Sequence, residues 1–266
     1  ASGFSVTLFQ DTSSAQLYIS FRGTDPQVAD WVGEADIFLG QGVAYQQVKA
    51  MVNWYLRAST PEGAQAVQLA ETWRMVEGQR VFNTYLTAGT GEIVGSPDYV
   101  VDGHSLGGHL TTAFARLFGS AATRSFTYNG AGFRGSADSI FRMIERSLGM
   151  AATAYPGESR QTNIFAEHGV NIATNDAWTG QFGQRVAVFN EAGTAVSNHR
   201  MYKLTDALAL FDVMGTVDEQ LSLADATKIL DAGSAIPDRS LETVLDALRR
   251  LCRSTDTTPT QIGDAP

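Results

Sequence analysis

The sequence contains a single cysteine, Cys252, among 266 residues. It has no partner for an internal disulfide, and no second thiol is present to build a cysteine-based metal site. Basic residues are also scarce, because 19 Lys and Arg stand against 28 Asp and Glu, for a formal net charge of -9. This acidic balance disfavours a phosphate-backbone partner, so we expect no binding of nucleic acid.

Long apolar runs are missing as well. None approaches the roughly 20 residues that span a bilayer, and we expect no transmembrane segment. Hydrophobic residues at 44% and charged residues at 18% are ordinary for a globular protein. We expect one domain over residues 1–254 and a polar, Pro-containing tail or linker at 255–266, and no pattern indicates the oligomeric state.

The first third of the chain predicts a hairpin followed by two helices. Residues 4–9 and 16–22 are β-branched and aromatic runs around the turn-rich segment 11–15. Apolar residues then recur at helical spacing over 46–56 and again over 64–86. The glycines of 89–95 precede a strand and do not open a helix, which indicates a loop and not a nucleotide-binding turn.

The rest of the chain alternates between strand and helix signals. We predict strands at 98–102, 125–128, 162–165 and 186–189, and helices after residue 105, over 136–148 and around 241–251. This order is typical of a mostly parallel sheet with crossover helices on both faces. The expected fold class is α/β, of the α/β-hydrolase type.

The strongest chemical signal is Gly103-His104-Ser105-Leu106-Gly107-Gly108, which lies between an expected strand and an expected helix. The G-x-S-x-G pattern in this context is typical of a nucleophile elbow, a strained turn that exposes the serine hydroxyl. The flanking glycines are required where a side chain would clash with nearby backbone. Ser105 is the candidate nucleophile, and the N–H of Leu106 can stabilise an oxyanion at the start of the helix.

A serine nucleophile needs a base, and the sequence offers four histidines: His104, His109, His168 and His199. His104 adjoins the nucleophile and His109 lies on the following helix, so neither faces the hydroxyl easily. His199 follows the last expected strand, as in the Ser, acid, His order of α/β-hydrolases. His199 is therefore the preferred base, and His168 is the minor alternative.

The order of three segments resembles that of class 3 lipases. These are Phe21-Arg22-Gly23-Thr24, then Asp30-Trp31, then the GHSLGG elbow. The later stretch 198–209 is similar to the histidine segment of bacterial extracellular lipases and phospholipases A. The resemblance spans residues 4–212. It implies that Thr24 is a second oxyanion-hole residue, that a lid lies at about 30–40, and that the protein is secreted.

The third triad member departs from the family pattern, which places an aspartate just after the strand that precedes the histidine loop. Glu167 stands at the end of that expected strand and can serve as the carboxylate. Asp176 lies deeper in the same loop and is an equal candidate. Asn171, another carboxylate or a weakened triad remain as alternatives, whereas Asp206 on the next helix is expected to pack or to stabilise the helix end.

These residues together predict a serine carboxylic-ester hydrolase that acts through an acyl-enzyme at Ser105. The resemblance implies a lipid ester substrate at an interface, either triacylglycerol or phospholipid. No cofactor is required, and calcium, though possible in such relatives, is indicated by no motif. A non-lipolytic esterase or acyltransferase with the same triad is the nearer alternative, and a non-catalytic lipid-binding module is the more distant one.

Overall fold

The computed structural model describes residues 2–23, 42–95, 99–119, 122–168, 179–191, 193, 198–234 and 241–252. The chain divides into two compact units. The first comprises Ala1–Asn163 and Ala173–Arg185, and the second comprises Ile164–Ile172 and Val186–Pro266. The expected lid at 30–40 and the expected tail at 255–266 both lie outside the described residues.

Six strands among the described residues form one sheet in the order β1-β2-β5-β6-β7-β8. β1 pairs with β2 in the antiparallel direction, whereas β5 pairs in parallel with both β2 and β6. The strands are β1 (Val6–Gln10), β2 (Leu17–Phe21), β5 (Tyr99–His104), β6 (Ala122–Tyr128), β7 (Gln161–Ala166) and β8 (Gln184–Val188). The predicted mixed α/β class with a mostly parallel sheet is thus confirmed.

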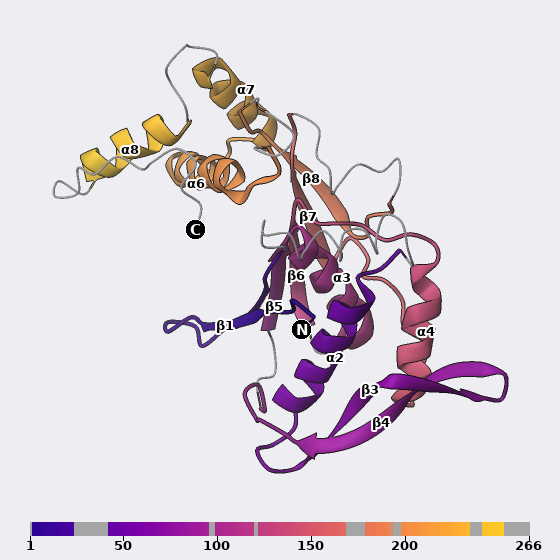
Figure 1. Ribbon diagram of the computed structural model, residues 1–266. Helices are drawn as coiled ribbons and strands as arrows, with labels where there is room; N and C mark the ends of the chain where they lie inside the picture. Colours follow the sequence, from indigo (N-terminus) through magenta and orange to yellow (C-terminus); the bar gives the residue numbers. More distant parts are fainter. Residues whose placement is uncertain are drawn as a thin grey trace. The chain divides into compact units, whose positions relative to one another are not determined.

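The first unit has its core between the sheet and three helices, which Figure 1 shows beside the strands. These are α2 (Tyr45–Ala58), α3 (Leu106–Phe118) and α4 (Ala137–Ser147). Alternate residues of β2 and β5 turn to this core because side chains of a strand point to opposite faces in turn. The fully buried members include Ile19, Phe21, Val101, Met51, Leu110, Phe114 and Phe141.

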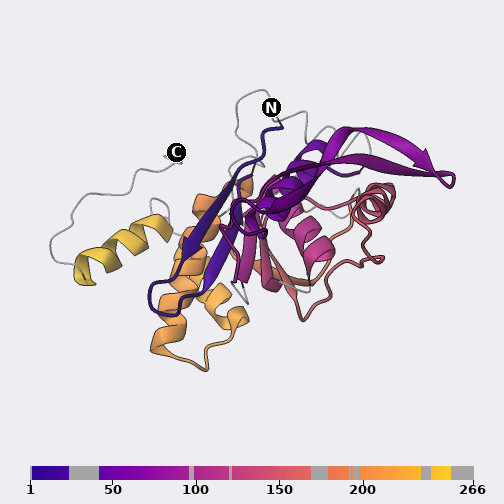
Figure 2. The same cartoon turned by 90° about the horizontal axis from the view of Figure 1, so that it is seen from below.

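The helix predicted over 64–86 is wrong. This segment forms an antiparallel ribbon of β3 (Gln65–Val76) and β4 (Gln79–Ala88), which packs against α2 and α4 and whose turn end projects beyond these helices in Figure 2. Its two-residue turn is Glu77-Gly78, and both residues have positive φ, of 51° and 74°. Such a turn suits a hairpin and breaks a helix, and the flanking β-branched and aromatic residues favour strands.

The other predicted elements are confirmed within a few residues. The hairpin is β1 and β2, the helix over 46–56 is α2, and the helix over 136–148 is α4. The strand, turn and helix around Ser105 are β5, Ser105 and α3. Their agreement rests on long, strongly patterned segments, for which periodicity is most informative.

The second unit is mainly helical after β8. Its helices are α6 (Met201–Val217), α7 (Leu223–Ser234) and α8 (Leu241–Cys252). Each buries apolar residues, namely Leu204, Ala207, Leu210, Ala226, Leu230, Leu241 and Leu245. Within the described ranges, no helix combines the length and the apolar character needed to cross a bilayer.

Candidate active site

Ser105 occupies the turn between β5 and α3 with a backbone that few non-glycine residues adopt. Its φ is 55° and its ψ is -121°. A positive φ brings the Cβ of an L-residue close to its own backbone, so a serine stays there only when its surroundings hold it. This is the strand, strained turn and helix arrangement that the motif predicts for a nucleophile elbow.

Three glycines around Ser105 are required by close backbone contact. A Cβ on Gly103 would lie 2.3 Å from the carbonyl of Gly107, and one on Gly107 would lie 2.1 Å from the carbonyl oxygen of Phe21. A Cβ on Gly108 would lie 2.7 Å from the Cα of Gly130. Backbone atoms cannot yield to such contacts without moving β2, β5 or the segment after β6, which explains the glycines of the motif.

Backbone hydrogen bonds hold the elbow from the side of β6. The N–H of Ser105 donates to the carbonyl of Tyr128 (3.0 Å), and the carbonyl of Ser105 accepts from the N–H of Ala131 (3.0 Å). The same carbonyl accepts from the N–H of His109 (3.3 Å) one turn into α3. Ser105 is also buried, with 5% of its surface exposed. Hydrogen bonds therefore hold both its backbone N–H and its backbone carbonyl inside the protein.

The end of β2 lies directly against the elbow. A Cβ on Gly23 would lie 2.6 Å from the carbonyl oxygen of His104 and 3.4 Å from the Cβ of Ser105. Thr24, the next residue and the expected second oxyanion-hole residue, lies outside the described residues. Leu106 is the first residue of α3, where an N–H lacks an intrahelical acceptor and the helix dipole favours negative charge.

Two histidines accompany Ser105 in the first unit. His109 is fully buried, and its Nδ1–H donates to the carbonyl of Gly132 (3.1 Å) while its Nε2 accepts from the N–H of Ala44 (3.2 Å). Burial lowers the pKa of His109 to about 4, so the ring is neutral near pH 7. Because both ring nitrogens have backbone partners, His109 is not placed to take a proton from Ser105. His104 ends β5 and is half-buried.

Asp102 is a half-buried acid that no motif in the sequence singled out. Its carboxylate accepts a hydrogen bond from the hydroxyl of Ser20 (2.7 Å), and burial raises its pKa despite that bond. Burial, together with the Asp102 charge, also raises the pKa of Tyr128. The only sequence signal was a charged residue at an interior position of an apolar strand, three positions before the nucleophile.

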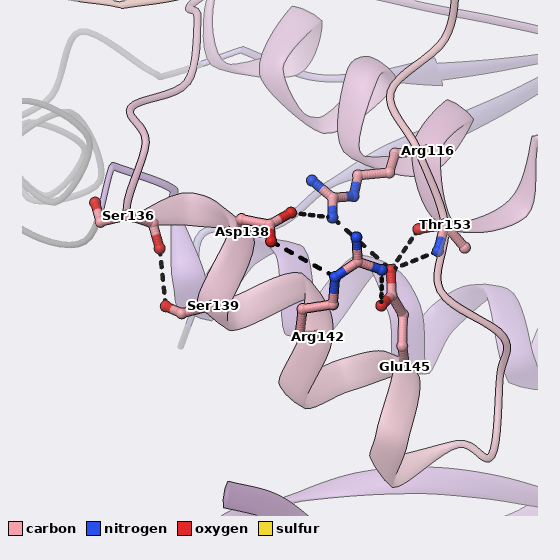
Figure 3. Close-up of polar contacts among 7 residues, drawn as sticks. All are labelled: Arg116, Ser136, Asp138, Ser139, Arg142, Glu145 and Thr153. Carbon is pink, nitrogen blue, oxygen red and sulfur yellow. Dashed lines mark hydrogen bonds and ion pairs between the residues drawn. The ribbon is translucent and has the colours of Figure 1, made fainter. Parts of the chain in front are cut away.

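A partly buried ion network joins α3 to α4 and to the segment after it (Figure 3). Arg116 donates to Asp138 (2.5 Å), lies 3.8 Å from a Glu145 oxygen and stacks over the rings of Phe141 and Tyr155. Arg142 and the N–H of Thr153 donate to the same Glu145 carboxylate at 2.8 and 3.0 Å. The Arg116 hydrogen bond keeps the pKa of Asp138 below its usual value.

The expected base, His199, belongs to the second unit, where it directly precedes the segment that becomes α6. It is half-buried. The residue before it, Asn198, is 1% exposed and donates through Nδ2 to the carbonyl of His168 (2.8 Å). The alternative base, His168, packs edge-on against Phe189, and within the described part of the chain its buried Nδ1 has no hydrogen-bond partner.

The candidate acids are placed only in part. Glu167 follows β7 in the second unit, with its side chain exposed and its N–H bonded to the carbonyl of Val188 (2.9 Å). Asp176 and Asn171 lie outside the described residues, and Asp206 is half-buried on α6. Ser105 and Leu106 belong to the first unit, and His199 and Glu167 belong to the second.

Metal binding has no candidate cluster in the described ranges, where no three His, Cys, Asp or Glu side chains are grouped suitably. No protein-family model matches the chain, and no curated protein matches it either.

Proposed function

We propose that this protein is a serine carboxylic-ester hydrolase that cleaves acyl esters of lipids. The observation that carries the proposal is the backbone of Ser105, whose φ of 55° is maintained between a parallel strand and a helix by glycine contacts and three backbone hydrogen bonds. Strain of this kind is retained where the surrounding structure enforces it, and it is concentrated at functional sites. An elbow of this form presents a serine hydroxyl beside a helix N-terminus.

In the proposed reaction, Ser105 Oγ attacks the ester carbonyl carbon and His199 accepts the hydroxyl proton. The carbonyl oxygen becomes an oxyanion, and the N–H of Leu106 at the start of α3 would donate to it. When the intermediate collapses, the C–O bond to the alcohol breaks and His199 returns the proton to the leaving oxygen. Water, deprotonated by His199, then attacks the acyl-enzyme and releases the fatty acid and Ser105.

The remaining roles follow the resemblance to class 3 lipases. Thr24 would supply the second oxyanion donor, because Gly23 just before it touches the elbow. Glu167 or Asp176 would orient His199. A lipid ester, either triacylglycerol or phospholipid, would be the substrate, and a comparison of the two with an acyl chain-length series identifies which.

The test is hydrolysis of p-nitrophenyl and glycerolipid esters by the purified protein. We expect Ser105→Ala and His199→Ala each to lower kcat by about 10⁵-fold or more, because members of a triad act as a unit. Ser139→Ala is the matched control, because the hydroxyl of this exposed serine on α4 donates to the nearby carbonyl of Ser136 (2.8 Å), and it should keep full activity. Full activity in Ser105→Ala would overturn the proposal.

A further inference from the structure

Two buried asparagines in the second unit connect the end of β7 to the segment that carries His199. Asn190 is 0% and Asn198 is 1% exposed. Both bind the backbone of one residue, His168, which lies 22 and 30 positions before them in the chain. Buried amides need partners for each polar atom, so these bonds fix where the three segments lie relative to one another within the unit.

Asn190 extends the pairing of β7 with β8 beyond the last strand residues. The backbone pairing closes with the N–H of Glu167 donating to the carbonyl of Val188 (2.9 Å). Beyond it, the N–H of His168 donates to Asn190 Oδ1 (2.7 Å), and Asn190 Nδ2 donates to the carbonyl of His168 (3.2 Å). The side-chain amide of Asn190 thereby replaces the backbone of a neighbouring strand. It bonds to both the N–H and the carbonyl of His168.

Asn198 adds a second donor to the same carbonyl and is itself fixed from the other side. Its Nδ2 lies 2.8 Å from the carbonyl oxygen of His168, and its Oδ1 accepts from Lys203 Nζ (3.3 Å). Lys203 also donates to the carbonyl of Glu191 (3.1 Å). Since the lysine can only donate, it requires the oxygen of the Asn198 amide on its side, and the nitrogen must then face His168.

We propose that Asn198 is a positioning residue for the candidate base. A peptide bond joins Asn198 directly to His199. When the Asn198 side chain is bonded to His168 beyond the end of β7, the backbone from which the His199 imidazole extends is held in place too. Catalysis is sensitive to such placement, because a misplacement of about 1 Å can cost about 10²-fold in rate. Asn190 and Lys203 support Asn198 in this role. The inference rests on the proposed function, in which His199 is the base.

The principal test is Asn198→Asp, which preserves size and keeps the oxygen that accepts from Lys203. It replaces the amide nitrogen that donates to the His168 carbonyl with an oxygen that cannot donate, so this hydrogen bond is lost. The new carboxylate forms an ion pair with Lys203, which helps the variant to stay folded. We expect kcat on a soluble ester to fall about 10²-fold with KM changed less than about three-fold, and the rate of Ser105 phosphonylation to fall in parallel. Asn198→Ala should show the same split.

Asn53 provides a matched control. Its amide holds one residue of β3 by the same two bonds, because the N–H of Leu69 donates to Asn53 Oδ1 (2.7 Å) and Asn53 Nδ2 donates to the carbonyl of Leu69 (3.0 Å). This pair lies in the first unit, between α2 and β3. We expect Asn53→Ala and Asn198→Ala each to lower Tm by about 3–6 °C, but Asn53→Ala should leave kcat and the phosphonylation rate unchanged.

The outcomes separate this inference from the proposed function. If wild type hydrolyses esters, His199→Ala is inactive and Asn198→Asp keeps kcat within about three-fold of wild type, the positioning role is overturned and the proposed function stands. If Asn53→Ala loses as much kcat as the Asn198 variants, the loss is general destabilisation, and the role is again overturned. If wild type neither hydrolyses esters nor reacts with the phosphonate, both proposals fail.

Discussion

The segments that carry the candidate nucleophile and the candidate base are held by different kinds of contact. Around Ser105 the contacts are between backbone segments. A Cβ added to the glycines there would lie 2.1–2.7 Å from backbone atoms of an adjacent segment. Before His199 the contacts are made by side chains, with Asn190, Asn198 and Lys203 bridging segments that are distant in sequence. A backbone contact tolerates almost no substitution, whereas a side-chain bridge can be removed one bond at a time.

This difference has a consequence for how function is lost. A change at the elbow should damage folding and activity together, because the nucleophile turn is part of the β2, β5 and α3 packing. A change in the asparagine bridge should reduce turnover in a protein that still folds. Gly107→Ala tests the first half of that contrast, and the Asn198 variants test the second.

The largest expected effect comes from Gly107→Ala. The added methyl group would lie 2.1 Å from the Phe21 carbonyl oxygen, so β2 and α3 must separate. We expect the free energy of unfolding to fall by more than about 3 kcal/mol and ester hydrolysis to drop to background. Urea denaturation and an activity assay on the folded fraction measure both.

Gly135→Ala is the control for this substitution, because a Cβ there meets nothing within 4 Å. It should change stability by less than about 0.5 kcal/mol. A Gly107→Ala protein with normal stability and activity would show that the close approach at the elbow is not required.

Arg116→Met should have the next largest effect, and on stability alone. It removes the cation that donates to Asp138 and lies beside buried Glu145, leaving that carboxylate with Arg142 and Thr153. We expect a loss of about 2 kcal/mol in the free energy of unfolding, since a hydrogen bond between charged groups is lost beside the buried Glu145 carboxylate. The kcat of the folded enzyme should be retained, because Arg116 lies in the last turn of α3 and Ser105 precedes the first.

The exposed pair Lys228–Asp225 on α7 is the reference for that experiment. Its two side chains are 76% and 56% exposed, so Lys228→Met should leave the free energy of unfolding almost unchanged. Equal losses of stability in the two variants would contradict a special contribution from the network around Arg116.

A smaller effect is expected from the pH dependence of His109. Its pKa is about 4 when folded and 6.5 when unfolded, so the unfolded chain binds a proton that the folded chain excludes. This contribution is fully present above pH 6.5 and declines as the pH falls toward 4, amounting to about 2 kcal/mol of lost stability by about pH 5. Denaturation of wild type and His109→Gln between pH 7 and pH 5 should show a weaker decline in the variant. Parallel declines would show that His109 does not titrate as described.

The fold and the site were predictable from sequence to different degrees. The strand, turn and helix around Ser105 followed from a contiguous motif, whose glycines report backbone contacts directly. The ribbon over 65–88 was missed, because apolar spacing outweighed the Glu77-Gly78 turn and that dipeptide is a weaker hairpin signal than Asn-Gly or Asp-Gly. Asn190 and Asn198 gave no signal at all, since their partner is a backbone group 22 and 30 residues away.

The central claim, that Ser105 is an activated nucleophile, is tested most directly by covalent labelling. Wild-type protein is incubated with a long-chain alkyl phosphonate fluoride ester, and the modified peptide is identified by mass spectrometry. Our account predicts one adduct, on Ser105, with none in Ser105→Ala and greatly slowed formation in His199→Ala. An unmodified Ser105 in protein that hydrolyses esters, or an adduct on a different residue that persists in Ser105→Ala, would contradict it.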